Sequence, residues 1–506
     1  MRRQGIIAVV FASLLVISVV VFFLVIKPMT RTEETPDETP ETEAGEVLGT
    51  QNRFFMFGSF DRKDIKTITV DNEYGGFTFE NNGKGEFRIK GFDSVNYNQE
   101  LFASLVSLST YTLAKTKVAS GLDKDGLAEY GLAKPEASWT VKTGGGDSYT
   151  VYVGDKLLTG GGYYCRLEGR NSVYVLGTEV EDAVLVPIEN YVTPVLSAGI
   201  SKDDYYMTED FTFYSHGEKL FSLRHVDKED MINPNALAEV IMDYPTEYYP
   251  NSSLYYQIIY SFMELYGDGC VKLGAGDADL KKAGLKEPAY RITYVYGGNE
   301  YEISFSEKKE EDGVYYAVSS MYPNVIAYCL AENFEYLEYG LIDWIEEYVF
   351  QEYVTNISEM SVKSDKVNAA FELFHDFDAE GNALLSIMSD EKRLTETQVE
   401  NFRQYYKSFL AVAIQDYYTN DEYCKMTEKE MEKFISNKDN AYLTFEYKTL
   451  DGKETELAFY RYSTRHSVVT INGVGEFYVL SDLVQKIEND TVRVLKGETV
   501  TAFGKN

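Results

Sequence analysis

The 506-residue sequence is poor in the side chains from which catalytic and metal centres are usually built. It has only four histidines and four cysteines, which are Cys165, Cys270, Cys329 and Cys424. The cysteines are too far apart for a CxxC motif or for the disulfide framework of a small secreted domain. The histidines lack HxH and HExxH spacing, and no GxSxG motif is present. We therefore expect no catalytic residue, no metal site and no cofactor, so the protein is predicted not to be an enzyme.

Basic residues are also scarce. Lys and Arg total 48 against 81 Asp and Glu, which gives a net charge of −33. Proteins that bind nucleic acid need clustered Lys and Arg to neutralise phosphates, so a nucleic-acid partner is excluded. The glycine-rich segments 144–146, 160–162 and 274–276 are not followed by the Gly-Lys-Ser/Thr of a P-loop, and we interpret them as hairpin turns.

Long hydrophobic runs are absent except at the N-terminus. Ile6–Ile26 contains 21 residues without a charge, which as a helix would span about 31 Å. Arg2 and Arg3 precede the run, so the positive-inside rule favours a cytoplasmic N-terminus. A cleaved signal peptide is the alternative, but its apolar region is usually shorter and ends in an A-x-A-like site. We predict that residues 1–28 form a cytoplasmic tip and one transmembrane anchor, with the rest of the chain outside the cytoplasm.

The segment after this run is acidic and lacks large apolar residues. Thr32–Glu46 holds seven acids and two prolines but no large apolar residue. Such a composition cannot bury enough surface to offset the entropy of ordering. We expect residues 29–52 to be an acidic disordered linker.

The rest of the chain contains an internal repeat. Strand-like segments recur at a step of 152 residues, beginning at Ala137, Ala289 and Ala441, and again at Val173, Val325 and Phe477. One period shared by three copies predicts repeated structural units. We place the units at 53–200, 201–352 and 353–506, with the third the most divergent.

Each unit has the same expected order of elements. A hairpin is followed by a helix with apolar residues three or four positions apart, such as Leu101, Leu105 and Leu108, and then by strands separated by Gly turns. Thr395 and Gln398 form a capping-box pattern before the third helix. The predicted fold class is α+β: a single N-terminal transmembrane helix, then three tandem repeats of an antiparallel sheet with a packed helix.

One set of motifs resembles a known family. Gly131-Leu132-x-x-Pro135, Val153-Gly154 and the segment 162–175 (GYYCRLEGRNSVYV) resemble the bacterial domain of unknown function 4340. The resemblance implies a membrane-anchored envelope protein. Members of the family are also often encoded beside ABC transporter components of the gliding-motility type. The resemblance also implies components of such a transporter as possible partners. It brings no known catalytic residues.

Tyrosine is the one residue type in marked excess, with 42 copies. Two Tyr-Tyr pairs repeat at the same step, Tyr163 with Tyr164 and Tyr315 with Tyr316. Tyrosine is enriched at interfaces, so we predict these four residues as a candidate contact surface. The alternative is that they fill half-buried strand positions.

Acidic motifs leave two further interpretations open. Asp376–Asn382 resembles the start of an EF-hand loop, but Ile387 stands where the bidentate Glu is needed, so we favour a hairpin turn. Two carboxylates close in space would suffice for a glycosidase.

The predicted function is that of a non-enzymatic, membrane-anchored extracytoplasmic binding or scaffold protein. It would be an accessory of an ABC transporter complex or would bind an envelope polymer. One alternative is an extracellular hydrolase acting on envelope glycan or peptide. The other is a purely structural envelope spacer.

Overall fold

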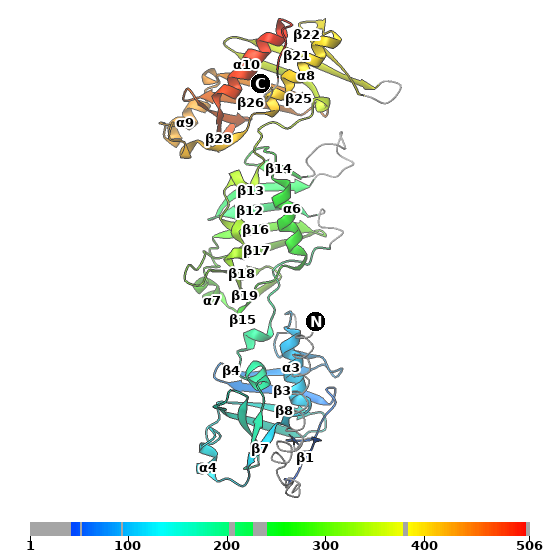
Figure 1. The fold of residues 1–506 in the computed structure, drawn as a ribbon, viewed down its shortest axis with the longest axis vertical. Coiled ribbons are helices and arrows are strands. Elements are labelled where there is room, and N and C mark those ends of the chain that lie inside the picture. Colours follow the sequence, from blue (N-terminus) through cyan, green and yellow to red (C-terminus); the bar gives the residue numbers. More distant parts are fainter. Residues whose placement is uncertain are drawn as a thin grey trace, which may run out of the picture. The chain divides into compact units, whose positions relative to one another are not determined.

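The computed structural model describes residues 42–50, 53–92, 95–201, 208–225, 240–377 and 383–501. The chain divides into two compact units. The first comprises the described parts of Met1–Gly91 and Glu100–Val186, and the second those of Phe92–Gln99 and Pro187–Asn506. The described residues form four antiparallel sheets with helices packed on them (Figure 1).

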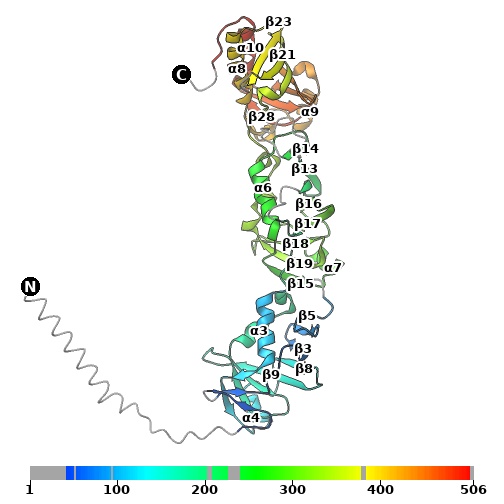
Figure 2. The same cartoon turned by 90° about the vertical axis from the view of Figure 1, so that its right-hand side faces the viewer.

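The first unit contains an eight-stranded sheet, which we call sheet 1. Its strands, in spatial order, are β5 (Phe87–Ile89), β4 (Gly75–Asn81), β3 (Ile65–Asn72), β8 (Ala137–Thr143), β9 (Ser148–Lys156), β10 (Tyr163–Leu167), β11 (Val173–Leu176) and β7 (Thr116–Ala119). Helix α3 (Gln99–Thr110) lies along one face (Figure 2). Its Phe102 ring contacts Phe79 of β4 at 5.0 Å between centroids. We call the opposite face the open face, and the short helix α4 (Lys124–Ala128) packs on one end of it.

The second unit contains two more sheets built in the same way. Sheet 2 consists of β14 (Val240–Tyr244), β13 (Glu218–His225), β12 (Glu209–Ser215), β16 (Tyr290–Tyr296), β17 (Asn299–Phe305), β18 (Val314–Ser319), β19 (Tyr322–Leu330) and β15 (Gly269–Leu273). Helix α6 (Ser252–Ser261) covers one face of sheet 2, and α7 (Asp277–Lys282) packs on the other.

Sheet 3 has nine strands. They are β23 (Lys392–Arg393), β22 (Ala383–Ser389), β21 (Asn368–Phe377), β20 (Ile357–Ser364), β25 (Leu443–Thr449), β26 (Glu454–Arg461), β27 (His466–Ile471), β28 (Val474–Leu480) and β24 (Ile414–Tyr417). The long helices α8 (Glu396–Leu410) and α10 (Ser481–Leu495) cover one face, and α9 (Glu428–Ile435) packs on part of the other. Apart from the added edge strand β23, strand order follows the same chain order in all three sheets, so the structure is a repeated sheet.

A small fourth sheet belongs to the first unit. It joins β1 (Val47–Leu48), β2 (Phe54–Phe55) and β6 (Leu113–Ala114). Strand β1 lies within residues 29–52, the segment expected to be a disordered linker, and residues 42–50 of that segment are among the described residues.

The predicted fold class is wrong as stated. The described residues form a mostly antiparallel-sheet structure with four sheets, where three were expected. Two-residue strands such as those of the fourth sheet carry no periodic signal, which is why the sequence did not reveal them. Within the described ranges, no helix is long and apolar enough to cross a membrane. The segment predicted as an anchor, residues 1–28, lies outside the described residues.

The repeat step also changes in the middle of the chain. Trp139 of β8 and Leu443 of β25 are buried on the helix-covered faces and are 304 residues apart, which is twice the predicted step. In sheet 2 the residue at the intermediate position is Arg291, which is partly exposed, while its neighbour Ile292 is fully buried. A shift of one residue in a strand moves every side chain to the other face. The second copy is therefore displaced by one residue at this strand.

Candidate functional site

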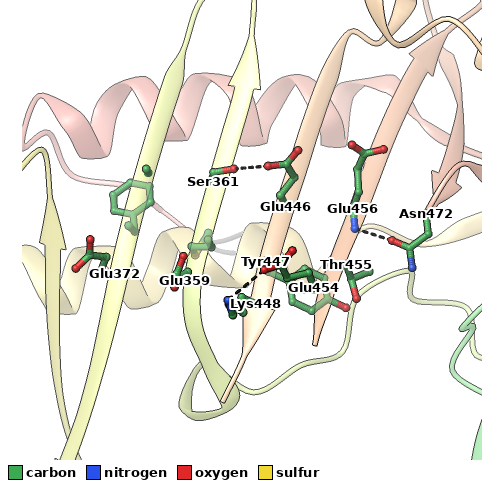
Figure 3. A pocket seen from close by; sticks show the side chains of 13 residues that line it. Glu359, Ser361, Glu372, Glu446, Tyr447, Lys448, Glu454, Thr455, Glu456 and Asn472 are labelled. Atoms are coloured by element: carbon green, nitrogen blue, oxygen red, sulfur yellow. Dashed lines mark hydrogen bonds and ion pairs between the residues drawn. The ribbon is translucent and has the colours of Figure 1, made fainter. Parts of the chain in front are cut away.

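The open face of sheet 3 is the strongest candidate for a functional surface. On the helix-covered face, Phe371 of β21 contacts Phe402 of α8 at 5.1 Å, and Phe445 of β25 contacts Phe409 at 4.3 Å. Successive side chains of a strand point to opposite faces. The neighbours of these phenylalanines in sequence, Glu372 and Glu446, therefore point away from the helices, as Figure 3 shows.

Carboxylates gather on this face around a hollow of about 500 Å³. The hollow crosses strands β21, β20, β25 and β26, and its charged lining is Glu359, Glu372, Glu446, Lys448, Glu454 and Glu456. These residues come from two segments about 75 residues apart in sequence, which the sheet brings together (Figure 3).

Like charges stand directly opposite each other in this array. Glu359 is paired with Glu372 across β20 and β21, and Glu446 with Glu456 across β25 and β26. Opposed like charges destabilise a sheet. The repulsion between these glutamates therefore lowers the stability of the unbound protein.

Two lysines compensate part of the charge. Lys448 Nζ lies 3.1 Å from Glu454 Oε1, and Lys438, from the 3₁₀ turn η11 (Lys438–Asn440), lies 2.6 Å from Glu456 Oε2. Hydrogen bonds to these carboxylates raise the pKa of both lysines, so both remain charged. Five carboxylates thus face two cations, and the surface keeps a negative charge.

The open faces of the other two sheets differ in chemistry. In sheet 1, Thr69 and Thr78 are opposite each other with their Oγ1 atoms 3.0 Å apart, and Thr140 and Thr150 repeat this arrangement at 3.0 Å. In sheet 2, the Arg291 guanidinium lies over the Tyr214 ring at 3.9 Å and pairs with Glu302 at 3.3 Å. Neither arrangement leaves carboxylates opposite each other.

The structure places two of the four predicted contact tyrosines in the core. Tyr163 is 6% exposed and Tyr315 is 1% exposed. Burial raises the pKa of both phenols, and the Tyr315 hydroxyl donates to Glu338 Oε1 at 2.9 Å. These two side chains are therefore not available to a partner.

Their neighbours Tyr164 and Tyr316 are half-buried on the opposite faces of the same strands. Tyr164 packs edge-on against Tyr130 at 4.9 Å, in the cluster beneath α4. Tyr316 packs in the matching cluster beneath α7. Adjacent residues of a strand point to opposite faces, and here both faces are covered. The four tyrosines do not form one exposed surface.

The predicted turn at Asp376–Asn382 lies only partly within the described structure. Asp376 belongs to β21, and residues 378–382 lie outside the described residues. His375, next to it, is a strand residue whose Nε2 lies 2.7 Å from the Ile357 carbonyl oxygen. Across the described part of the chain, no group of three or more His, Cys, Asp and Glu side chains is arranged to hold a metal ion.

Sequence reasoning missed one buried polar network. His466 Nδ1 lies 2.7 Å from Asp421 Oδ2, and the Tyr462 hydroxyl donates to the same carboxylate. Burial alone would raise the pKa of Asp421, but these hydrogen bonds lower it. Asp421 and His466 are 45 residues apart, so no local motif indicates the contact. The network lies beside the hydrophobic cluster beneath α9, away from the acidic hollow, and we assign it a structural role.

Comparison with known proteins locates a family resemblance mainly in the first unit, over its residues 100–186. The family model described as a domain of unknown function (DUF4340) matches residues 95–196. No curated protein and no solved structure matches the chain.

The matched region runs from just before α3 to beyond β11 and contains the glycines of the sequence motif. Gly131 has a φ of +71°, and a Cβ on Gly154 would lie 2.2 Å from the Tyr130 carbonyl oxygen, so both positions require glycine. The motif thus holds the α4 turn against β9. Over residues 95–196 the chain resembles the DUF4340 family, a domain of unknown function.

Proposed function

We propose that this protein is a non-enzymatic binding or scaffold protein that contacts a cationic partner through the open face of sheet 3. One observation carries the proposal: three sheets share a strand order, yet on this open face glutamates oppose one another across strands. In a repeated framework, the features that one copy has and the others lack are the best candidates for function.

The charge pattern determines which partner fits. Lys or Arg side chains placed between Glu359 and Glu372, or between Glu446 and Glu456, would replace repulsion with attraction. Complementary charge increases the rate of encounter and suppresses wrong partners, and its effect weakens as salt is added. A basic protein surface fits this face, whereas a polyanionic envelope polymer would be repelled.

Apolar residues beside the carboxylates support a protein partner. Phe374 follows Glu372 by two positions on β21 and is 49% exposed, and Leu384 of β22 is 50% exposed. Asp376 is two residues after Phe374 on β21, so the two side chains share the open face. Leu384 is directly opposite Asp376 and therefore lies on this face too. Exposed aromatic side chains within a polar rim are typical of protein interfaces.

We extend the proposal to location and partner class. The family resemblance supports a place outside the cytoplasm, and a basic subunit of a transporter complex would fit the acidic face. Protease added to intact cells should digest the body of the protein. Full protection would contradict this location.

A hydrolase is the second candidate, since Glu359 and Glu372 are directly opposite across two strands. Side chains in such pairs lie close together, as the two carboxylates of a glycosidase must. Release of reducing sugars from envelope glycan, lost in Glu359→Gln and Glu372→Gln, would favour this candidate.

A titration with oligolysine tests the binding proposal. The variant Glu372→Gln/Glu446→Gln/Glu456→Gln removes three charges from the open face. A matched control, Glu310→Gln/Glu311→Gln/Glu332→Gln, removes three exposed charges elsewhere and gives the same net charge. We expect oligolysine to bind the native chain and the control at low salt, and the first variant at least tenfold more weakly. Equal affinity of both variants would show that overall acidity, not this face, attracts cations.

A further inference from the structure

A carboxylate in the first unit is buried among cationic and phenolic groups. The side chain of Glu46 has no exposed surface. Its Oε2 accepts a hydrogen bond from Lys117 Nζ at 2.9 Å, its Oε1 accepts one from the Tyr174 hydroxyl, and Arg170 Nη1 lies 3.9 Å from Oε1. The Lys117 and Arg170 side chains are only 9% and 10% exposed. We propose that Lys117, Arg170 and Tyr174 form a binding site for an acidic turn, the Glu46 clamp, which holds the end of the chain's own acidic segment.

The clamp binds a short turn with a glutamate at each end. The Glu46 amide donates to the Glu43 carbonyl at 3.0 Å, and the Glu43 amide donates to Glu46 Oε2 at 2.8 Å. Glu43 accepts a hydrogen bond from the Ser172 hydroxyl, and Arg170 Nη2 donates to the Ala44 carbonyl at 2.6 Å. Both carboxylates and the backbone between them are thus bound.

Sheet 1 supplies the binding groups from fixed positions. Lys117 of the edge strand β7 is directly opposite Tyr174 of β11. Arg170 precedes β11 and also donates to the Met56 carbonyl at 2.6 Å, which fixes its guanidinium. The acidic segment contributes only the bound turn. The residues from sheet 1 and its loop therefore act as a receptor, and the turn acts as the ligand.

The turn geometry selects one register of the acidic segment. Glu38-Thr-Pro-Glu41 has the same spacing of glutamates as Glu43-Ala-Gly-Glu46. The third position of the bound turn is Gly45 at a φ of +83°, and proline is restricted to a φ near −65°. Residues 38–41 therefore cannot replace residues 43–46 in the clamp.

The clamp also explains why β1 forms. Glu46 directly precedes β1, whose two residues pair only with the two residues of β2. So short a pairing adds little by itself. Loss of the Glu46 charge would remove the carboxylate that compensates two nearly buried cations, and removing one side of a buried ion pair is strongly destabilising.

Hydrogen exchange of the full chain tests the clamp. In Glu46→Gln, we expect amides of residues 42–50 and 54–55 to exchange about 100-fold faster, with no change in β8 and β9. The control Glu181→Gln removes an ion pair of 2.7 Å with Lys156, whose partners are both nearly half exposed. It should leave residues 42–50 unaffected. Lys117→Met should act like Glu46→Gln, and Lys117→Arg should retain protection.

Two results would overturn the proposal. Unchanged exchange of residues 42–50 in both Glu46→Gln and Lys117→Met would show that the ionic contacts do not hold the segment. Faster exchange in β8 and β9 as well would show that Glu46 supports the whole unit, so that no separate clamp exists. Neither result bears on cation binding by sheet 3, since all clamp residues lie in the first unit.

Discussion

The open faces of sheets 1 and 3 have the same strand order, but the side chains that stand opposite each other on them interact differently. In sheet 1, Thr78, Thr69, Thr140 and Thr150 stand opposite one another in a row across four strands. Their hydroxyls pair with each other, so the row is neutral and internally bonded. In sheet 3, glutamates oppose glutamates in the corresponding central strands. The shared framework determines the fold, and the open face determines what can bind.

The largest expected effect separates the two faces of one strand. Phe445→Ala should lower the free energy of unfolding by about 3–5 kcal/mol, because it removes a buried ring that contacts Phe409 and Phe350. Glu446→Ala, one residue on, should change it by less than about 0.5 kcal/mol, because the side chain is exposed. Urea denaturation measures both. A similar loss in the two variants would contradict the assignment of helix-covered and open faces.

Lowering the pH should release residues 42–50 of the first unit by protonating Glu46 in the clamp. The threonine row of sheet 1 has no group that titrates in this range. Burial alone would raise the pKa of Glu46, but hydrogen bonds from Tyr174 and Lys117 lower it. The clamp therefore contributes its full stability above the ordinary Glu pKa and loses it as the pH falls through the lowered value. Hydrogen exchange of residues 42–50, corrected for the intrinsic rate at each pH, should rise in this range.

In Glu46→Gln this rise should disappear, because no carboxylate remains to be protonated at that position. A rise of the same size in the variant would assign the acid sensitivity to another group.

Removing one hydroxyl from the threonine row should destabilise sheet 1. Thr140→Val breaks the 3.0 Å contact with Thr150 and leaves the Thr150 hydroxyl half-buried. We expect a loss of about 0.5–1.5 kcal/mol in the free energy of unfolding. Thermal denaturation of the variant beside the native chain measures this, and a gain in stability would show that the row is not a stabilising network.

The smallest effect should have the opposite sign. Glu446→Gln removes one like-charge pair with Glu456 and keeps an oxygen that can accept the Ser361 hydrogen bond. In the absence of a binding protein, the free energy of unfolding of the variant should rise by about 0.2–1 kcal/mol. The gain should shrink as salt is added, because salt screens the repulsion. A loss of stability would mean that Lys438 and Lys448 already neutralise this face.

The sequence predicted local features well. The capping box of Thr395 and Gln398 is confirmed at the start of α8, and Leu105 and Leu108 are buried on α3 as their spacing indicated. These features depend on residues within a few positions of each other, so a local pattern is enough to reveal them.

Features that depend on distant residues were not predictable. Glu46 contacts Lys117 and Arg170, which are more than 70 residues away in the sequence. The composition of its segment predicted disorder, because composition does not reveal a binding site formed by distant residues. Similarly, alternation in a strand shows that a glutamate and a phenylalanine face opposite ways. It does not show which face a helix will cover or which glutamates will oppose each other.

The most direct test of the central claim is site-specific photo-crosslinking in cells from the two open faces. A photoreactive residue at Ser361 lies in the acidic hollow of sheet 3, and one at Thr140 lies in the threonine row of sheet 1. We predict a crosslink from Ser361 to a protein with a basic surface, lost when Glu372, Glu446 and Glu456 are changed to Gln, and no such crosslink from Thr140. A crosslink from Thr140 to the same protein, or none from Ser361, would contradict the claim that the acidic face is the binding surface.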